Sequence, residues 1–267
     1  MKKTLIGLLA GSLLFGACST PKKTEGISIA NGGKVWGSLW QQRSAEYRAL
    51  CFQAYNLAKL RLDEAIKQPG AKPFAVVTDI DETLLDNSPY DAMRAVNNLE
   101  FDSKTWKVWT AKAQADTVPG APAFFKYAAS KGVAVFYITN RDEDERAGTM
   151  KNLKLYNLPN TDDAHLLLRQ TASSKEARRQ DILKTHQIVL LCGDNLPDFD
   201  RLYDNHPTEQ NRQAATDRLK KEFGDRYIVI PNLSYGDFEG AWFNFNYKLS
   251  RMQKDSIIKA KLKTDKQ

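Results

Sequence analysis

The chain has 267 residues, of which 42% are hydrophobic and 10% are aromatic. This composition excludes an intrinsically disordered protein and suffices for one good core with a small accessory domain. The net charge of +7 favours an anionic substrate or an anionic membrane as partner. No known nucleic-acid-binding motif accompanies this charge, so we expect no nucleic-acid polymer among the partners.

Residues 1–17 have the features of a lipoprotein signal peptide. Lys2 and Lys3 precede an apolar run from Leu5 to Phe15, which is too short to span a bilayer as a permanent helix. Small residues then precede Cys18 and resemble a bacterial lipobox, although Phe15 lies where that box prefers leucine. The alternative is an ordinary signal peptide with a coincidental cysteine. We expect lipidation of Cys18 and anchoring in the bacterial cell envelope, in the outer membrane because the next residue does not resemble an inner-membrane retention signal.

The next segments predict a tether and then a helical region. Residues 18–35 are polar and contain glycine, which is typical of a flexible tether. Apolar residues at helical spacing fill residues 36–70, where Pro69 and Gly70 end the pattern. Cys51 in this region and Cys192 further on are interpreted as buried hydrophobic residues rather than as a disulfide.

Short apolar runs alternate with helical patterns in residues 71–237. The runs predict strands at 74–78, 133–139, 165–168, 187–192 and 227–230, and the patterns between them predict helices at 121–130, 143–156, 175–184 and 208–223. This order predicts an α/β fold, with a parallel sheet and helices on both faces. Residues 84–118 interrupt the alternation as an insertion, and residues 238–267 form a C-terminal helical segment.

Polar residues follow three of these strands directly. The first strand is followed by Asp79 and Asp81, the second by Thr139, Asn140 and Arg141, and the fourth by Asp194 and Asp198. In an open α/β sheet, binding sites form outside the carboxyl ends of the strands. Four aspartates at one edge are electrostatically costly, and a divalent cation is the simplest compensation.

These positions suggest roles in phosphoryl transfer. Asp79, at a strand end, is placed to attack phosphorus and form an aspartyl phosphate. Asp81 is placed to act as general acid on the leaving oxygen and then as general base on water. Thr139 offers a hydroxyl group, and Lys175 at a predicted helix start offers a positive charge.

The same carboxylates suggest a Mg²⁺ site. Mg²⁺ prefers oxygen ligands, which Asp79 and Asp194 provide through carboxylates and Asp81 through its backbone carbonyl. Asp198 is placed to orient metal-bound water from outside the first coordination sphere.

The ordered motifs resemble the haloacid dehalogenase-like hydrolase superfamily, with Asp79 and Asp81 in its first motif, Thr139 in the second, Lys175 in the third, and Asp194 with Asp198 in the fourth. Residues 80–88, 105–109 and 231–236 look like the class C nonspecific acid phosphatases, which are bacterial lipoproteins with a four-aspartate signature. The resemblance covers about residues 36–248. It implies a Rossmann-like core and a smaller α-helical domain, to which residues 36–70 would belong.

This resemblance also implies a function. Such enzymes hydrolyse phosphomonoesters with Mg²⁺, often 5′-nucleotides and nicotinamide mononucleotide, and often form homodimers. Asn140 and Arg141 follow the second motif at substrate-binding positions. Trp106 and Tyr235 match positions that stack on a base, which suits aromatic rings because every base has a flat face. The alternative for Trp106 and Tyr235 is simple packing.

Other functions are compatible with parts of the pattern. Asp81 argues against a dehalogenase, because those enzymes lack the second aspartate of the first motif. A sugar phosphatase is opposed only by the insertion and by Trp106 and Tyr235. A ligand-binding lipoprotein with an inactive site is opposed by the presence of all four aspartates.

Overall fold

The computed structural model describes residues 26–265, and its centre is a five-stranded parallel sheet. The strands are β1 (Phe74–Thr78), β4 (Ala134–Asp142), β5 (Leu166–Arg169), β6 (Gln187–Gly193) and β7 (Tyr227–Val229), in the order β5-β4-β1-β6-β7. All neighbouring pairs are parallel. The predicted α/β fold with a parallel sheet is therefore confirmed. The signal peptide and Cys18 lie outside the described residues.

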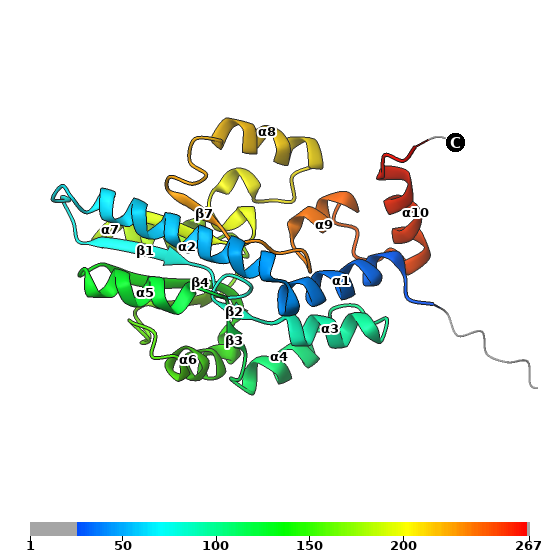
Figure 1. Cartoon of the computed structure of the whole chain (residues 1–267), viewed down its shortest axis with the longest axis horizontal. Coiled ribbons are helices and arrows are strands. Elements are labelled where there is room, and N and C mark those ends of the chain that lie inside the picture. The colour runs from blue at the N-terminus through cyan, green and yellow to red at the C-terminus, as the bar shows by residue number, and fades with distance from the viewer. Residues whose placement is uncertain (1–25, 266–267) are drawn as a thin grey trace, which may run out of the picture.

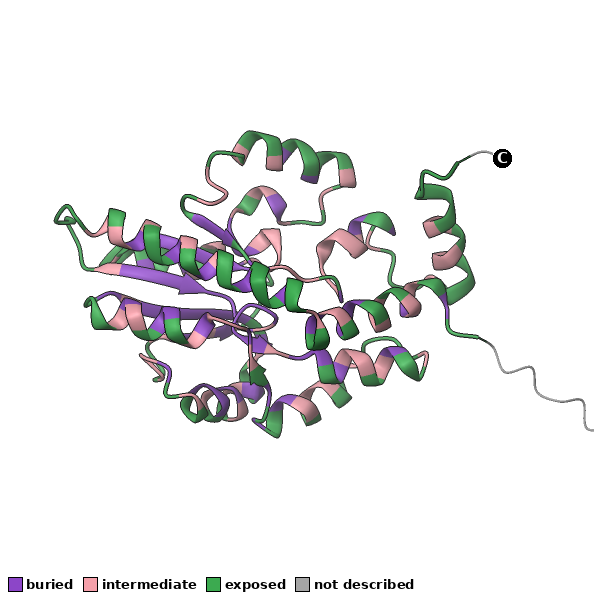
Figure 2. Ribbon diagram, in the orientation of Figure 1, coloured by how far each residue is buried: buried purple, intermediate pink, exposed green. Residues whose placement is uncertain are grey.

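Helices cover both faces of this sheet (Figure 1). One face packs on α2 (Ala45–Ala65), α5 (Ala121–Ser130) and α6 (Arg146–Leu155), and the other on α7 (Glu176–Thr185) and the end of α8 (Glu209–Leu219). Alternate residues of β1 divide between the two cores, with Val76 in one and Val77 in the other. Figure 2 shows β1 buried along most of its length, as expected for a strand covered on both sides.

The remaining elements gather mainly at one end of the molecule (Figure 1). There α1 (Ile29–Arg43) packs against α3 (Ser88–Val96) and α10 (Arg251–Lys261). The other short elements are β2 (Leu85–Asp86), β3 (Asp116–Thr117), α4 (Ser103–Ala111), α9 (Asp237–Trp242) and the 3-10 turns η1 (Glu143–Glu145), η2 (Leu196–Asp198) and η3 (Arg201–Tyr203). The insertion, helix α1 and the C-terminal segment therefore lie together beyond the carboxyl ends of the strands.

Two predicted N-terminal segments require correction. Residues 29–35, predicted as tether, are helical, because the Ser28 side chain caps α1 and Asp255 of α10 accepts a hydrogen bond from the Ile29 amide at 3.0 Å. The helical segment predicted at 36–70 breaks at Ser44, which ends α1 and caps α2. Only α1 joins the helical end of the molecule, whereas α2 packs on the sheet and supplies core residues such as Tyr55 and Leu62.

Other boundaries differ from the predicted ones. The strand predicted at 133–139 continues to Asp142, so Asn140 and Arg141 lie within β4 rather than after it. The C-terminal helical segment is interrupted between α9 and α10, where Asn244 and Phe245 have positive φ values of 49° and 54°.

Cys51 and Cys192 are both buried and unpaired, as expected for small hydrophobic residues. Within residues 26–265, no helix is long and apolar enough to cross a membrane.

Candidate active site

Three of the four predicted aspartates form one carboxylate cluster. Asp79 follows β1, and its amide donates to the Cys192 carbonyl of the neighbouring β6 at 2.9 Å. Carboxylate oxygens of Asp79, Asp194 and Asp198 all lie within 4.8 Å of one another. The adjacency of β1 and β6 therefore brings together residues that are far apart in the chain.

A close backbone approach holds Asp198 in this cluster. Its Oδ2 accepts a hydrogen bond from the Asn195 amide at 3.0 Å. Gly193 packs closely against Asp198, because a Cβ atom at this glycine would lie only 2.4 Å from the Asp198 Cβ. A side chain at position 193 would thus displace the carboxylate.

The carboxylates of this cluster are buried and close together, which makes their ionised forms electrostatically costly. Burial raises the pKa of Asp79 to about 7, Lys175 opposes this rise, and the nearby Asp198 adds to it. Burial, followed by the charges of Asp198 and Asp79, raises the pKa of Asp194 well above its ordinary range. Buried carboxylates in this number fit a divalent metal ion, which supplies the missing positive charge. Asp79, Asp194 and Asp198 are the residues that could hold it.

Lys175 lies inside the same cluster. Its ammonium group contacts the Asp79 Oδ1 and lies 2.6 Å from the Asp198 Oδ1, and the residue is only 4% exposed. The two carboxylates raise the Lys175 pKa above its ordinary value, although burial acts to lower it. The lysine is therefore a buried positive charge that orients Asp79.

Asp81 is directed away from the cluster. Arg141 donates to both of its carboxylate oxygens, with the shortest contact of 2.7 Å from Nη2 to Oδ1. The Asn87 side-chain amide donates to the same Oδ1 at 2.8 Å, and the Thr139 hydroxyl lies 3.4 Å from Oδ2. Nη1 of Arg141 donates to the Thr149 hydroxyl at 3.0 Å. Arg141 thus links Asp81 to helix α6.

The residues of the second motif hold one another in place. The Thr139 hydroxyl accepts a hydrogen bond from the Arg141 amide at 3.1 Å. The Asn140 side-chain oxygen accepts one from Arg178 at 2.8 Å, and Arg178 also donates to the Thr139 carbonyl at 2.6 Å. Burial lowers the pKa of Arg178 to about 10.

Sequence reasoning missed a buried network behind the first motif. Glu82 is fully buried with a positive φ of 58°, and it accepts hydrogen bonds from the Asn87 amide and the Tyr235 hydroxyl. The Trp109 indole donates to the Asn87 side-chain oxygen at 2.8 Å. These residues lie in the segments 80–88, 105–109 and 231–236, close to the motif residues. Because they only hold other side chains in place, the spacing of residues in the sequence did not identify this role.

Asp194 has supporting residues of its own. Asn232 donates to its Oδ2 at 2.8 Å, and Thr83 donates to its Oδ1 at 3.0 Å. Both were within predicted segments, but neither was singled out. Each of them satisfies one of the two carboxylate oxygens of Asp194.

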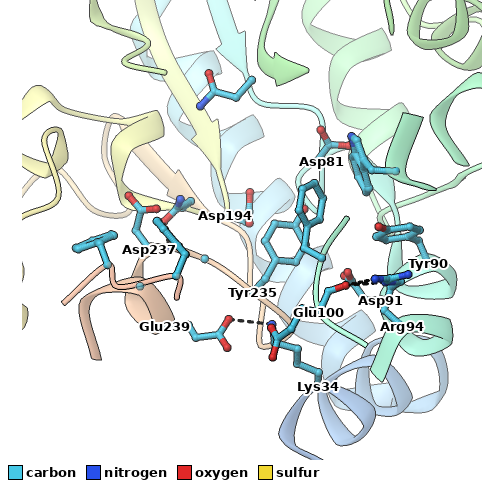
Figure 3. Close-up of a pocket in the computed structure, with 18 of the residues that line it drawn as sticks. Lys34, Asp81, Tyr90, Asp91, Arg94, Glu100, Asp194, Tyr235, Asp237 and Glu239 are labelled. Carbon is cyan, nitrogen blue, oxygen red and sulfur yellow. Dashed lines mark hydrogen bonds and ion pairs between the residues drawn. The ribbon is translucent and has the colours of Figure 1, made fainter. Parts of the chain in front are cut away.

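A cavity of about 560 Å³ opens beside these residues (Figure 3). Asp79, Asp81, Lys175 and Asp194 line it, as do Asn140, Arg141, Trp106 and Tyr235. The Trp106 ring packs edge-to-face on Tyr90 at 5.2 Å between ring centroids, and its face lies 5.7 Å from the Arg141 guanidinium. The volume suits a small organic ligand, and the aromatic rings suit a flat one.

Comparisons with known proteins agree with this architecture. The structure of the class C acid phosphatase from Bacillus anthracis matches with a TM-score of 0.84 and 38% sequence identity, over 89% of this chain and 99% of that chain. A crystal structure of the class C acid phosphatase from the same organism with tungstate bound matches with a TM-score of 0.85 at the same identity and coverage.

A more distant relative is the stem 31 kDa glycoprotein of Glycine max. It is 28% identical over 126 residues, which amount to 45% of this chain and 50% of that protein. The match thus spans half the length of this relative.

The family model of the HAD superfamily, subfamily IIIB (acid phosphatase), matches residues 32–238. This range begins within α1, ends within α9 and contains the sheet, the insertion and every residue of the carboxylate cluster. The match covers most of the chain and agrees with the order of motifs, with the fold and with the solved class C relatives. The chain therefore belongs to the HAD superfamily, subfamily IIIB, the acid phosphatase family.

Proposed function

We propose that this protein is a Mg²⁺-dependent acid phosphatase that hydrolyses small phosphomonoesters with Asp79 as nucleophile. One observation carries the proposal: the Asp79 carboxylate contacts the Lys175 ammonium group and lies within 4.8 Å of two further carboxylates, and all of these residues line a cavity that aromatic rings also line. A nucleophile that is oriented by a buried cation, next to oxygen ligands for a metal, is suited to phosphoryl transfer.

In the first step, an oxygen of Asp79 attacks phosphorus, and the bond from phosphorus to the leaving oxygen breaks. Asp81 donates a proton to that oxygen, which leaves as an alcohol, and an aspartyl phosphate remains on Asp79. Oδ2 of Asp81 suits proton transfer because its contacts, 3.1 Å to Arg141 and 3.4 Å to Thr139, are longer than the 2.7 Å contact at Oδ1.

In the second step, Asp81 takes a proton from water, whose oxygen attacks the phosphoryl group. The bond from Asp79 to phosphorus breaks, inorganic phosphate forms, and both aspartates return to their initial states. Lys175 keeps Asp79 in place as this group changes from carboxylate to acyl phosphate and back.

Mg²⁺ would supply positive charge to the phosphoryl oxygens in both steps. Asp79 and Asp194 would hold it through carboxylates and Asp81 through its backbone carbonyl, and the Asp198 carboxylate, which lies within 4.8 Å of those of Asp79 and Asp194, would support the site. The tungstate-bound relative supports an oxyanion site in this fold, because tungstate is a tetrahedral oxyanion like phosphate.

The substrates we propose are 5′-nucleotides or nicotinamide mononucleotide. Trp106 and Tyr235 both line the cavity, and their flat rings suit stacking on a base. The hydroxyl of Tyr235 donates to Glu82, which fixes its ring. Asn140 and Arg141 are proposed to contact the substrate at the mouth of the cavity, in addition to the contacts they make within the protein.

We also propose that the enzyme is tethered to the cell envelope, in the outer membrane, by lipidation of Cys18. Helix α1 begins at Ile29, close in sequence to this cysteine, so the tether would be short. A homodimer, which the family resemblance implies, stays a prediction.

Hydrolysis of p-nitrophenyl phosphate at mildly acid pH tests the function. We expect Mg²⁺-dependent turnover by the wild type and loss of turnover in Asp79→Asn with the fold retained. Dialysis against EDTA should abolish activity and added Mg²⁺ should restore it. Absence of turnover by folded, metal-loaded protein, on this substrate and on a nucleotide panel, would favour the ligand-binding alternative instead.

A further inference from the structure

The end of the cavity away from Asp81 and Asp194 carries charged residues from α1, α3 and α9 (Figure 3). Lys34 pairs with Glu239 at 3.0 Å, and Lys254 pairs with Glu100 at 2.8 Å. Within each pair, the lysine and the glutamate balance each other's charge. Asp91 of α3 lies among them, and Figure 3 shows it at the level of Tyr235, between Asp81 and Lys34.

Asp91 differs from its neighbours because it has an acceptor without a donor. Its Oδ2 is buried and accepts no hydrogen bond from any residue in the range 26–265. The residue as a whole remains partly open to the cavity. A buried acceptor without a partner is destabilising and rare, and a bound ligand is one of the ordinary ways in which such an acceptor is satisfied.

The surroundings of Asp91 offer it no alternative partner. Lys34 is near enough to oppose the rise in its pKa, but it is engaged with Glu239. Burial, the largest effect, raises the Asp91 pKa to about 7. Asp86 and Asp81 add to this rise, so the neighbouring carboxylates also favour a donor at this position.

Position in the cavity indicates which part of a ligand would supply this donor. A phosphomonoester with its phosphorus at Asp79 must place its leaving group further along the cavity, past the rings of Trp106 and Tyr235. Asp91 lines the same cavity beside Tyr90, whose ring contacts Trp106. A donor on that leaving group would therefore come close to the Asp91 carboxyl group, which lines the cavity.

We propose that Asp91 is a specificity-determining residue, whose carboxyl group accepts a hydrogen bond from a hydroxyl or amino group on the leaving group of the substrate. This inference rests on the proposed phosphatase function. It adds that the enzyme distinguishes phosphomonoesters by a hydrogen-bond donor and not only by an aromatic ring. A site with a buried polar group selects strongly against ligands that leave this group unpaired.

The test compares kcat/KM of the full-length wild type and Asp91→Leu, a variant of similar size without the acceptor. Phenyl phosphate has no donor on its leaving group, and adenosine 5′-monophosphate has ribose hydroxyls and a base amine. For Asp91→Leu we expect a loss of roughly tenfold on the nucleotide and a change within about twofold on phenyl phosphate, as for one lost hydrogen bond.

Two analogues identify the donor. The 2′,3′-dideoxy nucleotide lacks the ribose hydroxyls, and purine riboside 5′-monophosphate lacks the amine. The analogue without the responsible group should be a poorer substrate for the wild type, and Asp91→Leu should remove that difference. Glu100→Gln is the matched control, because Glu100 lines the same cavity but is paired with Lys254, and it should keep the wild-type preference.

Thermal unfolding separates this role from a structural one. Loss of an unpaired buried oxygen should leave the Tm of Asp91→Leu unchanged or higher. An equal loss on phenyl phosphate and the nucleotide, with a lower Tm, would overturn the proposal, as would an unchanged ratio between them. If the wild type hydrolysed neither compound, the phosphatase proposal would fall. Calorimetry would then decide the Asp91 contact, with nucleotide binding that is equally tight in wild type and Asp91→Leu overturning it.

Discussion

Arg141 donates hydrogen bonds to both carboxylate oxygens of Asp81. This pair connects the first motif, which follows β1, to the second motif, which lies in the neighbouring strand β4. The arginine is 3% exposed and also donates to Thr149 of α6. A bidentate contact of this kind restricts the rotation of the carboxylate as well as stabilising it. The orientation of Asp81 is therefore decided by a residue from a different strand.

Replacement of Arg141 by lysine tests that relationship. Lysine keeps the charge but loses the planar fork, so Asp81 should lose its orientation. We expect kcat to fall by roughly 10–100-fold with a smaller change in KM, because positioning acts on the chemical step. A rise in KM with kcat retained would show instead that Arg141 acts mainly in substrate binding. Thr149→Val, which removes only the supporting hydroxyl, should have a weaker effect of the same kind.

Replacement of Lys175 by methionine should impair both catalysis and metal-free stability. The variant keeps the length of the side chain but leaves Asp79 and Asp198 without their buried counter-charge. Steady-state kinetics should show a loss of kcat of at least roughly 100-fold, in line with removal of one charge-stabilising group. Arg178→Lys, which changes a neighbouring cation outside the cluster, should lose less. Activity near that of the wild type in Lys175→Met would contradict the proposed orientation of Asp79.

Metal-free protein should become less stable as pH rises from about 4 to above 7. The folded-state pKa of Asp79 is raised from 3.8 to about 7, so the folded protein holds a proton that the unfolded chain has lost. Stability is then full below the unfolded pKa and is lost as pH rises through the folded one, by up to about 1.4 kcal/mol per pH unit for each such group. Asp194 and Asp91 act in the same direction, whereas the lowered pKa of His186 opposes them.

Chemical denaturation at several pH values measures this dependence. Mg²⁺ should flatten the slope, because bound metal favours the ionised carboxylates. Asp79→Asn should reduce the slope in the metal-free protein. A stability that rises with pH over this window without metal would be incompatible with the buried carboxylate cluster.

Tyr235 and Glu82 should be coupled energetically. The Tyr235 hydroxyl donates to the buried Glu82, whose other hydrogen bond comes from the Asn87 amide. Tyr235→Phe should lower the free energy of unfolding by about 1–3 kcal/mol, because a buried carboxyl group loses its donor. The phenyl ring remains, so KM for a nucleotide should change little, whereas Tyr235→Ala should raise it. A double-mutant cycle with Glu82→Gln measures the coupling, and additive effects would exclude it.

The sequence predicted the sheet and most of the cluster for a common reason. Short apolar runs are typical of strands that are buried on both faces of a parallel sheet. Because the carboxyl ends of these strands meet at the same edge of the sheet, the residues that follow them lie at that edge. Asp79, Asp81, Thr139 and Asp194 were located in this way. Lys175 was located by its order between motifs, and the structure places it against Asp79.

Other features depended on contacts between distant segments. The start of α1 at Ile29 is supported by Asp255, from the opposite end of the chain, and no local pattern reports that contact. The pairing of Arg141 with Asp81 could not be distinguished from substrate binding, because both roles place the same residue type at the same edge. Glu82 and Asn87 lie in the segment 80–88, but their partners Tyr235 and Trp109 come from other segments of the chain.

The sequence by itself therefore determined the α/β class, the family and the edge of the sheet where the chemistry lies, because these depend on local hydrophobic runs and on the residues that end them. Only the tertiary structure decided which carboxylates share a cluster, which way Asp81 is directed and that Asp91 lacks a donor. The physical reason is that hydrogen bonding and desolvation act between side chains over a few ångströms, and only folding brings distant segments within that distance.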